Sequence, residues 1–239
     1  MKLLHIPQFG PAWHAWRRTV LGGSDATILS GTPVPWTDPP TPLSIWKIKT
    51  GRAEPQESTF AMRRGTRLEP LIRAAFLAKT GLDSARPWCV AHETHDWLGA
   101  SLDGLDPWGE WIAEFKAPNL KAHRAALEGQ VPDYYVPQVQ HQLCVTGAQL
   151  CYYVSYSENK EIAEADRVAV IEVRPDPALI RRLLLIEHTF WGFVRFDIEP
   201  TNDVIIPLHG GKSGEHSGAG SQPENPDRAE RTEGQSGAA

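Results

Sequence analysis

Residues 100–118, ASLDGLDPWGEWIAEFKAP, place two carboxylates and one ammonium group among apolar residues. Asp103 stands before a glycine, and Glu114 and Lys116 lie two positions apart in a segment typical of a strand. Because alternate residues of a strand face the same side, Glu114 and Lys116 project together and Phe115 faces the opposite side. A hairpin over 98–116 would bring Asp103 close to Glu114. The sequence therefore predicts a charged cluster at one end of a sheet.

Such a cluster favours a bound cation. Carboxylates that lie within a few ångströms repel, so that one takes up a proton or both bind a positive ion. An all-oxygen site suits Mg²⁺ or Mn²⁺, which can lower the pKa of a bound water and polarise a phosphoryl oxygen. Lys116 would orient that water or neutralise charge on the phosphate. Taken singly, Asp103 also fits a β-turn, and Glu114 with Lys116 also fits the exposed face of an edge strand.

Two predicted helices carry further polar candidates. Glu69 follows the basic run RRGTR and would add a third carboxylate, or would pair with Arg73 four positions later. Gln138 and Gln142 share one face of a later helix, where their amides could hold a phosphate or the attacking water. The alternative for these two glutamines is a polar stripe on a surface helix.

The segment WRRTVLGGSDA, residues 16–26, suggests an anion site. A glycine-rich turn that leads into a helix can cradle a phosphate, and an arginine adds a forked contact. Arg17 and Ser24 are the candidates, with Ser24 as the expected N-cap of a helix that ends at Gly31. Arg18 is adjacent, and the sequence leaves open which of the two arginines faces the site.

The hydrophobic pattern predicts an α/β fold. Helices come first, followed by three strands, two helices, two strands and a closing helix, which indicates a mixed central sheet covered on both sides. Pro70 falls inside a long helical segment, and we expect a first helix to end or kink near Gly65. The predicted strands are 87–93, 97–104, 110–118, 149–157 and 166–173, and the predicted helices are 11–20, 22–31, 41–51, 59–81, 119–129, 132–147 and 176–198.

Composition sets the limits of the prediction. With 239 residues, 41% hydrophobic and 22% charged, the chain suits one soluble globular domain. Its net charge of −5 argues against a basic coat over the whole surface, although local arginine and lysine clusters could still line a groove. Neither a membrane span nor a signal-peptide core is visible, so we expect a cytoplasmic protein. We expect a single folded domain over 1–207 and a disordered acidic tail over 208–239, rich in Gly, Ser and Pro.

Five segments occur in a fixed order: WRRTVLGGSDA, RRGTRLEP, SLDG, EFK and PQVQHQL. As a set they resemble the YqaJ-like viral recombinase group, which belongs to the lambda-exonuclease branch of the PD-(D/E)XK nuclease superfamily. The resemblance spans about residues 13–156 and implies a restriction-endonuclease-like core. It also implies digestion of linear double-stranded DNA from the 5′ end, in a bacterial host, leaving a 3′ single-stranded tail on which a phage-encoded annealing protein loads.

The resemblance assigns roles to particular residues. Lys116 would position or activate the water, and Gln138 matches the glutamine of the family's helix, with Gln142 as a second candidate. Arg17 and Ser24 match positions that grip the 5′ phosphate. The implied ligands of Mg²⁺ or Mn²⁺ are Glu69, Asp103, Glu114 and the backbone carbonyl of Phe115.

Some family features do not transfer directly. The family's Pro-Asp pair is Leu102-Asp103 here, which keeps the ligand. Some relatives are ring-shaped trimers, and the oligomeric state of this chain stays open. Iron–sulfur members need four cysteines, whereas this chain has three, so we exclude that cofactor. Two alternatives also stay open: a structure- or site-selective endonuclease on the same fold, and a non-catalytic DNA-end-binding recombination accessory protein.

Overall fold

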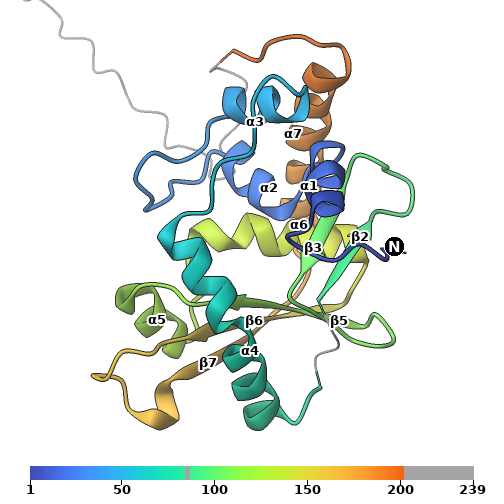
Figure 1. Cartoon of the computed structure of the whole chain (residues 1–239). Helices are drawn as coiled ribbons and strands as arrows, with labels where there is room; N and C mark the ends of the chain where they lie inside the picture. Colours follow the sequence, from blue (N-terminus) through green and yellow to red (C-terminus); the bar gives the residue numbers. More distant parts are fainter. Residues whose placement is uncertain (84–86, 202–239) are drawn as a thin grey trace, which may run out of the picture.

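A computed structural model describes residues 1–83 and 87–201 (Figure 1). The predicted tail, 208–239, and the domain limit at 207 lie outside the described residues. The helices are α1 Pro11–Arg18, α2 Gly23–Leu29, α3 Pro42–Lys49, α4 Phe60–Thr80, α5 Leu120–Leu127, α6 Val136–Thr146 and α7 Pro177–Arg195, with short 3-10 helices at Asp133–Tyr135 and Glu164–Asp166. The strands are β1 Lys2–Leu4, β2 Trp88–Ala91, β3 Gly99–Leu102, β4 Gly104–Leu105, β5 Trp111–Lys116, β6 Leu150–Tyr156 and β7 Val168–Val173.

In helix α4, tertiary packing overrides the tendency of a proline to break a helix. It runs without interruption through Pro70, so the predicted helix end near Gly65 is wrong. A proline inside a helix costs about 3 kcal/mol. Burial of an aliphatic or aromatic side chain contributes roughly 1.5–3 kcal/mol, and α4 buries Leu68, Ile72 and Phe76 on one face. These contacts outweigh the loss of one backbone hydrogen bond.

The strands form two sheets where one central sheet was expected. Strands β1, β2 and β3 make a three-stranded antiparallel sheet, and β4, β5, β6 and β7 make a four-stranded mixed sheet. Strands β5 and β6 pair in parallel because the chain between them crosses over through α5 and α6. Asp103 is the residue between β3 and β4, where the chain passes from one sheet to the other.

The two faces of the mixed sheet have different neighbours. Ala113 and Phe115 pack on the side of α4, in one hydrophobic cluster with Phe76. Ile112 belongs to a second, larger cluster together with residues of α6 and α7. Figure 1 shows α6 between the mixed sheet and the layer of α1, α2, α3 and α7. The alternation of β5 thus turns Glu114 toward α6, as its spacing from Phe115 predicts.

Helices α2 and α6 approach closely at a glycine. A Cβ added at Gly23 would lie 2.9 Å from Cγ of Gln138 and 3.2 Å from its carbonyl oxygen. Only a residue without a side chain fits there without a shift of α6.

Within the described ranges, none of the helices has the length and apolar character required to cross a bilayer.

Candidate active site

Glu114 is the centre of the site and is only 2% exposed. Its Oε1 accepts a hydrogen bond from Nε2 of Gln138 at 2.6 Å and forms an ion pair with Nζ of Lys116. Its Oε2 accepts a hydrogen bond from Nε2 of Gln142 at 2.7 Å. The two glutamines lie one turn apart on α6, as their spacing predicts, and face a buried carboxylate instead of solvent. The hydrogen bonds from the two glutamines and the contact with Lys116 therefore fix the orientation of the Glu114 carboxylate.

Lys116 is held as a cation. Its Nζ also donates to Oε1 of Gln138 at 3.2 Å and lies 4.9 Å from the centroid of the Tyr135 ring. Burial alone would lower the pKa of Lys116, but the negative charge of Glu114 opposes this effect, and the net pKa is raised. A protonated lysine can donate hydrogen bonds and place positive charge, but it cannot accept a proton from water.

Asp103 lies beside two other carboxyl groups, those of Glu114 and Glu69. Its Oδ2 accepts a hydrogen bond from the backbone N–H of Phe115 at 2.7 Å, which links the residue before β4 to the paired strand β5. Burial is the main cause that raises the pKa of Asp103 well above its ordinary value, and the carboxylates of Glu114 and Glu69 raise it further. A bound cation would relieve this repulsion. The chemistry of Asp103 and Glu114 therefore fits a hard divalent ion with oxygen ligands.

Glu69 lies on α4 at the same end of the sheet, but it has an internal partner. Its Oε1 accepts a hydrogen bond from Nη2 of Arg73 at 3.0 Å, which is the i, i+4 pair that the sequence offered as the alternative. Arg73 also donates to the backbone carbonyl of Asp103. Throughout 1–83 and 87–201, no three His, Cys, Asp or Glu side chains are grouped as a metal site. Glu69 and the carbonyl of Phe115 therefore remain predicted ligands.

Arg17 and Ser24 meet on the α1–α2 side of the site. Nη2 of Arg17 donates to Oγ of Ser24 at 2.8 Å, and the guanidinium lies 4.9 Å from the centroid of the Trp13 ring. Arg18 contacts the carbonyl of Ala53 and the carboxylate of Glu54. Arg17 is thus the arginine beside the glycine turn.

The prediction that Ser24 caps α2 is wrong. The N-cap is Gly22, whose N–H donates to Oδ2 of Asp25 at 2.9 Å. Gly22 has the extended backbone of an N-cap, and Asp25 three residues later supplies the acceptor. The hydroxyl of Ser24 is therefore left on the exposed side with Arg17. Gly23 lies so close to Gln138 that an added Cβ would collide with it, and this close approach joins the turn to the Glu114 cluster.

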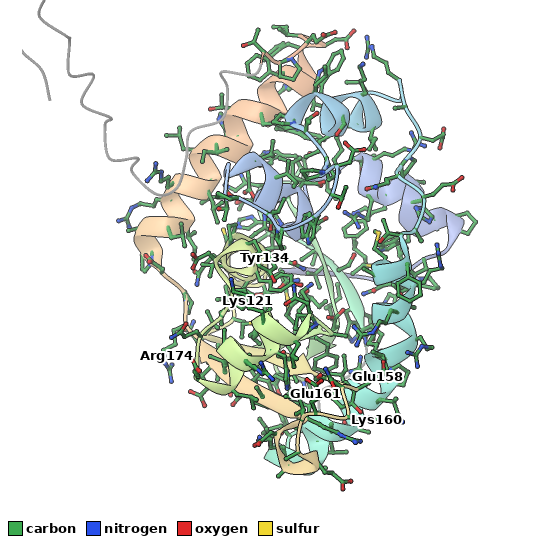
Figure 2. All side chains as sticks on the ribbon, turned by 90° about the vertical axis from the view of Figure 1, so that its left-hand side faces the viewer. Lys121, Tyr134, Glu158, Lys160, Glu161 and Arg174 are labelled. Atoms are coloured by element: carbon green, nitrogen blue, oxygen red, sulfur yellow. The ribbon has the colours of Figure 1, made fainter. Side chains whose placement is uncertain are left out.

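Acidic residues of the β6–β7 connection neutralise part of the expected basic groove. Glu158 lies 3.5 Å from Nε of Arg64 and 3.1 Å from Nη2 of Arg67, both on α4. Figure 2 shows Glu158, Lys160 and Glu161 together on this connection. Surface ion pairs of this kind are worth about 0–1 kcal/mol, so a DNA phosphate could replace Glu158 at little cost.

The family model of the YqaJ-like viral recombinase domain matches residues 12–149. The chain belongs to this family. Glu69, Asp103, Glu114, Lys116 and the glutamines of α6 all lie within the matched part, as do Arg17 and Ser24.

Relatives of the YqaJ-like chain agree with this assignment. An uncharacterized protein, YqaJ of Bacillus subtilis (strain 168), is 28% identical over 182 residues, which are 75% of this chain and 54% of that protein. The chain thus spans about half the length of this curated relative.

Solved structures also match the YqaJ-like chain. An alkaline exonuclease from Laribacter hongkongensis, LHK-Exo, has a TM-score of 0.66 and 26% identity, and the match covers 80% of this chain and 95% of that one. The same enzyme has been solved in complex with dAMP. A phage-related exonuclease from Haemophilus somnus 129PT has a TM-score of 0.55 and 12% identity, over 75% of this chain and 96% of that one. The expected restriction-endonuclease-like fold is confirmed.

Sequence reasoning missed three contributors to the YqaJ-like site. Tyr135 was not singled out, although it directly precedes the glutamine helix and its ring faces Lys116. Lys49 and Asp25 form a buried ion pair behind Arg17. A lysine in the last turn of a helix ordinarily indicates a solvated, dipole-compensating residue, so the sequence carried no signal for this pair.

Proposed function

We propose that the chain is a divalent-metal-dependent exonuclease that degrades one strand of linear double-stranded DNA from its 5′ end. The product is a 3′ single-stranded tail suited to strand annealing in phage-type recombination. The observation that carries this proposal is the arrangement of Glu114, held by Gln138, Gln142 and Lys116, beside Asp103. The likeness to an alkaline exonuclease supports it.

The metal site is proposed from the oxygen donors. Asp103 and Glu114 would hold Mg²⁺, or Mn²⁺ in its place, and Glu69 and the carbonyl of Phe115 complete the predicted ligand set. When bound, such an ion supplies a more acidic water and charge stabilisation at the phosphate. Burial and the neighbouring carboxylates of Glu114 and Glu69 raise the pKa of Asp103, and a bound cation would offset both effects, which supports the proposed site.

The protein groups orient the reaction. Glu114 keeps one carboxylate direction because Gln138 and Gln142 bind its two oxygens. Lys116, which stays protonated, donates to the water or to a non-bridging phosphate oxygen and offsets the charge that develops there. Hydrolysis adds the oxygen of water to phosphorus and breaks the bond from phosphorus to the 3′ oxygen, which leaves as a hydroxyl once protonated.

Arg17 and Ser24 would bind the terminal 5′ phosphate. A guanidinium and a hydroxyl give charge-assisted contacts to phosphate oxygens. Because Gly23, the residue before Ser24, lies close to Gln138, a phosphate held by the pair would set the distance from the strand end to Glu114. Such a subsite favours an exonuclease over the endonuclease alternative.

The family resemblance carries the remaining proposals. The 3′ tail would be passed to a single-strand annealing protein in the host cytoplasm. A ring-shaped trimer around DNA is the oligomer to test, by light scattering of the purified protein.

The test uses purified protein and linear duplex DNA with a closed circular duplex beside it. With Mg²⁺ we expect loss of the linear DNA, an intact circle and no reaction in EDTA. Cleavage of the circle would favour the endonuclease. Binding to ends without cleavage of either substrate, across Mg²⁺ and Mn²⁺, would favour the accessory protein.

A further inference from the structure

A buried ion pair lies behind the Arg17–Ser24 pair. Nζ of Lys49, on α3, is 2.8 Å from Oδ2 of Asp25, and the two side chains are 4% and 13% exposed. The same Nζ donates to the backbone carbonyls of Arg17 at 2.8 Å and Val20 at 2.7 Å. An ammonium group has three donors, and all three donors of Lys49 bind acceptors within residues 17–25. One side chain thus ties together the two helices that carry Arg17 and Ser24.

Asp25 is a carboxylate that would otherwise compete for Arg17. Burial alone would raise the pKa of Asp25, but the charges of Lys49 and Arg17 act in the opposite direction, and the net pKa is lowered. The group therefore stays ionised. In the structure Oδ2 of Asp25 is taken by Lys49 and by the N–H of Gly22, while Arg17 donates to Ser24.

We propose that Lys49 and Asp25 are positioning residues of the 5′-phosphate subsite. Lys49 neutralises Asp25, so that the Arg17 guanidinium is not drawn to that carboxylate and, with the Ser24 hydroxyl, is directed at a terminal phosphate. The ligand is a phosphomonoester at a DNA 5′ end. Its identity rests on the proposed function, whereas the network itself rests on the contacts given above.

Two variants separate this role from a purely structural one. Lys49→Met removes the cation and leaves Asp25 charged, so that Arg17 becomes its nearest counterion and is withdrawn from the phosphate. Lys49→Met with Asp25→Asn removes both charges together. The double variant has neither an uncompensated buried charge nor a competitor for Arg17, so we expect it to recover most of the phosphate recognition.

The experiment measures binding in EDTA, where cleavage is blocked. Short duplexes labelled at a 3′ end, with either a 5′ phosphate or a 5′ hydroxyl, are titrated with protein by fluorescence anisotropy. We expect wild type to prefer the phosphate by about tenfold, as for one lost charge-assisted contact. Lys49→Met should bind both ends equally, and the double variant should regain most of the preference. Lys47→Met, an exposed lysine on the same helix, is the matched control and should keep the wild-type ratio.

The outcomes discriminate clearly. A Lys49→Met protein that keeps the preference overturns the inference, as does a folded double variant that lacks it. If Lys49→Met is unfolded in a thermal melt, the double variant carries the test. A wild type that ignores the phosphate overturns the subsite itself. A wild type that prefers the phosphate but does not cleave linear DNA in Mg²⁺ overturns the nuclease proposal and leaves this inference standing.

Discussion

At the scale of single residues, Gln142 is the donor to the second oxygen of Glu114. Its Nε2 binds Glu114, and its Oε1 is buried without a hydrogen-bond partner among the described residues. An unsatisfied buried carbonyl costs about 1–3 kcal/mol, so the amide is held in this direction by its bond to the carboxylate. Gln142→Leu should leave Oε2 of Glu114 without its donor and lower kcat about tenfold or more.

The measurement for Gln142 is a comparison of kcat and KM on linear duplex DNA. Because Gln142 affects the reaction only through Glu114, the loss of activity in Gln142→Leu should appear in kcat, with KM nearly unchanged. Gln130→Leu, an exposed glutamine after α5, is the control. Equal kcat values for Gln142→Leu and wild type would show that Gln138 and Lys116 suffice to orient Glu114.

At the scale of elements, the contact of α2 with α6 sets the position of Gln138. Gly23→Ala would place a Cβ 2.9 Å from Cγ of Gln138, and α6 must shift to admit it. We expect this variant to fold but to lose most of its nuclease activity, since a small displacement of catalytic groups can cost about 100-fold. Gly192→Ala on α7, where a Cβ meets no atom within 4 Å, should keep activity. Assay of both variants beside thermal melts separates displacement from unfolding.

Elements also show what the sequence could predict. The alternation in β5 predicted the common face of Glu114 and Lys116, and helical spacing predicted the common face of Gln138 and Gln142, because both periodicities are local. The three-residue strand β1 is too short to have a pattern. Lys49 and Asp25 lie on separate helices and are 24 positions apart in the sequence. The continuity of α4 through Pro70 depends on tertiary packing. Neither feature has a local signal.

At the scale of the whole molecule, His141 and Glu187 join the three parts that surround the site. Nδ1 of His141 on α6 lies 2.7 Å from Oε1 of Glu187 on α7, and Nε2 lies 2.9 Å from the carbonyl of Gly99 on β3. Burial lowers the pKa of His141, but Glu187 and the hydrogen bonds raise it more, so the net pKa is raised. The charged pair therefore stabilises the fold across layers.

The sign of this shift predicts a pH dependence of stability. A raised folded pKa means that the contribution is fully present below the unfolded histidine pKa of about 6.5 and is lost as pH rises through the folded value. Glu187→Gln should destabilise the protein by about 3 kcal/mol at pH 6 and by less at high pH. Denaturant titrations of both proteins across pH 6–9 measure the difference. A difference that grows with pH would contradict the assignment.

The proposed nuclease activity depends most directly on Glu114. The most direct measurement is a time course on linear duplex DNA carrying a label at either the 5′ or the 3′ end of one strand, with Mg²⁺, for wild type and Glu114→Gln. We predict early release of the 5′ label from wild type, late release of the 3′ label, and about a thousandfold loss of rate in Glu114→Gln, comparable to removal of a central catalytic group. Release of the 3′ label first, or undiminished cleavage by Glu114→Gln, would contradict this prediction.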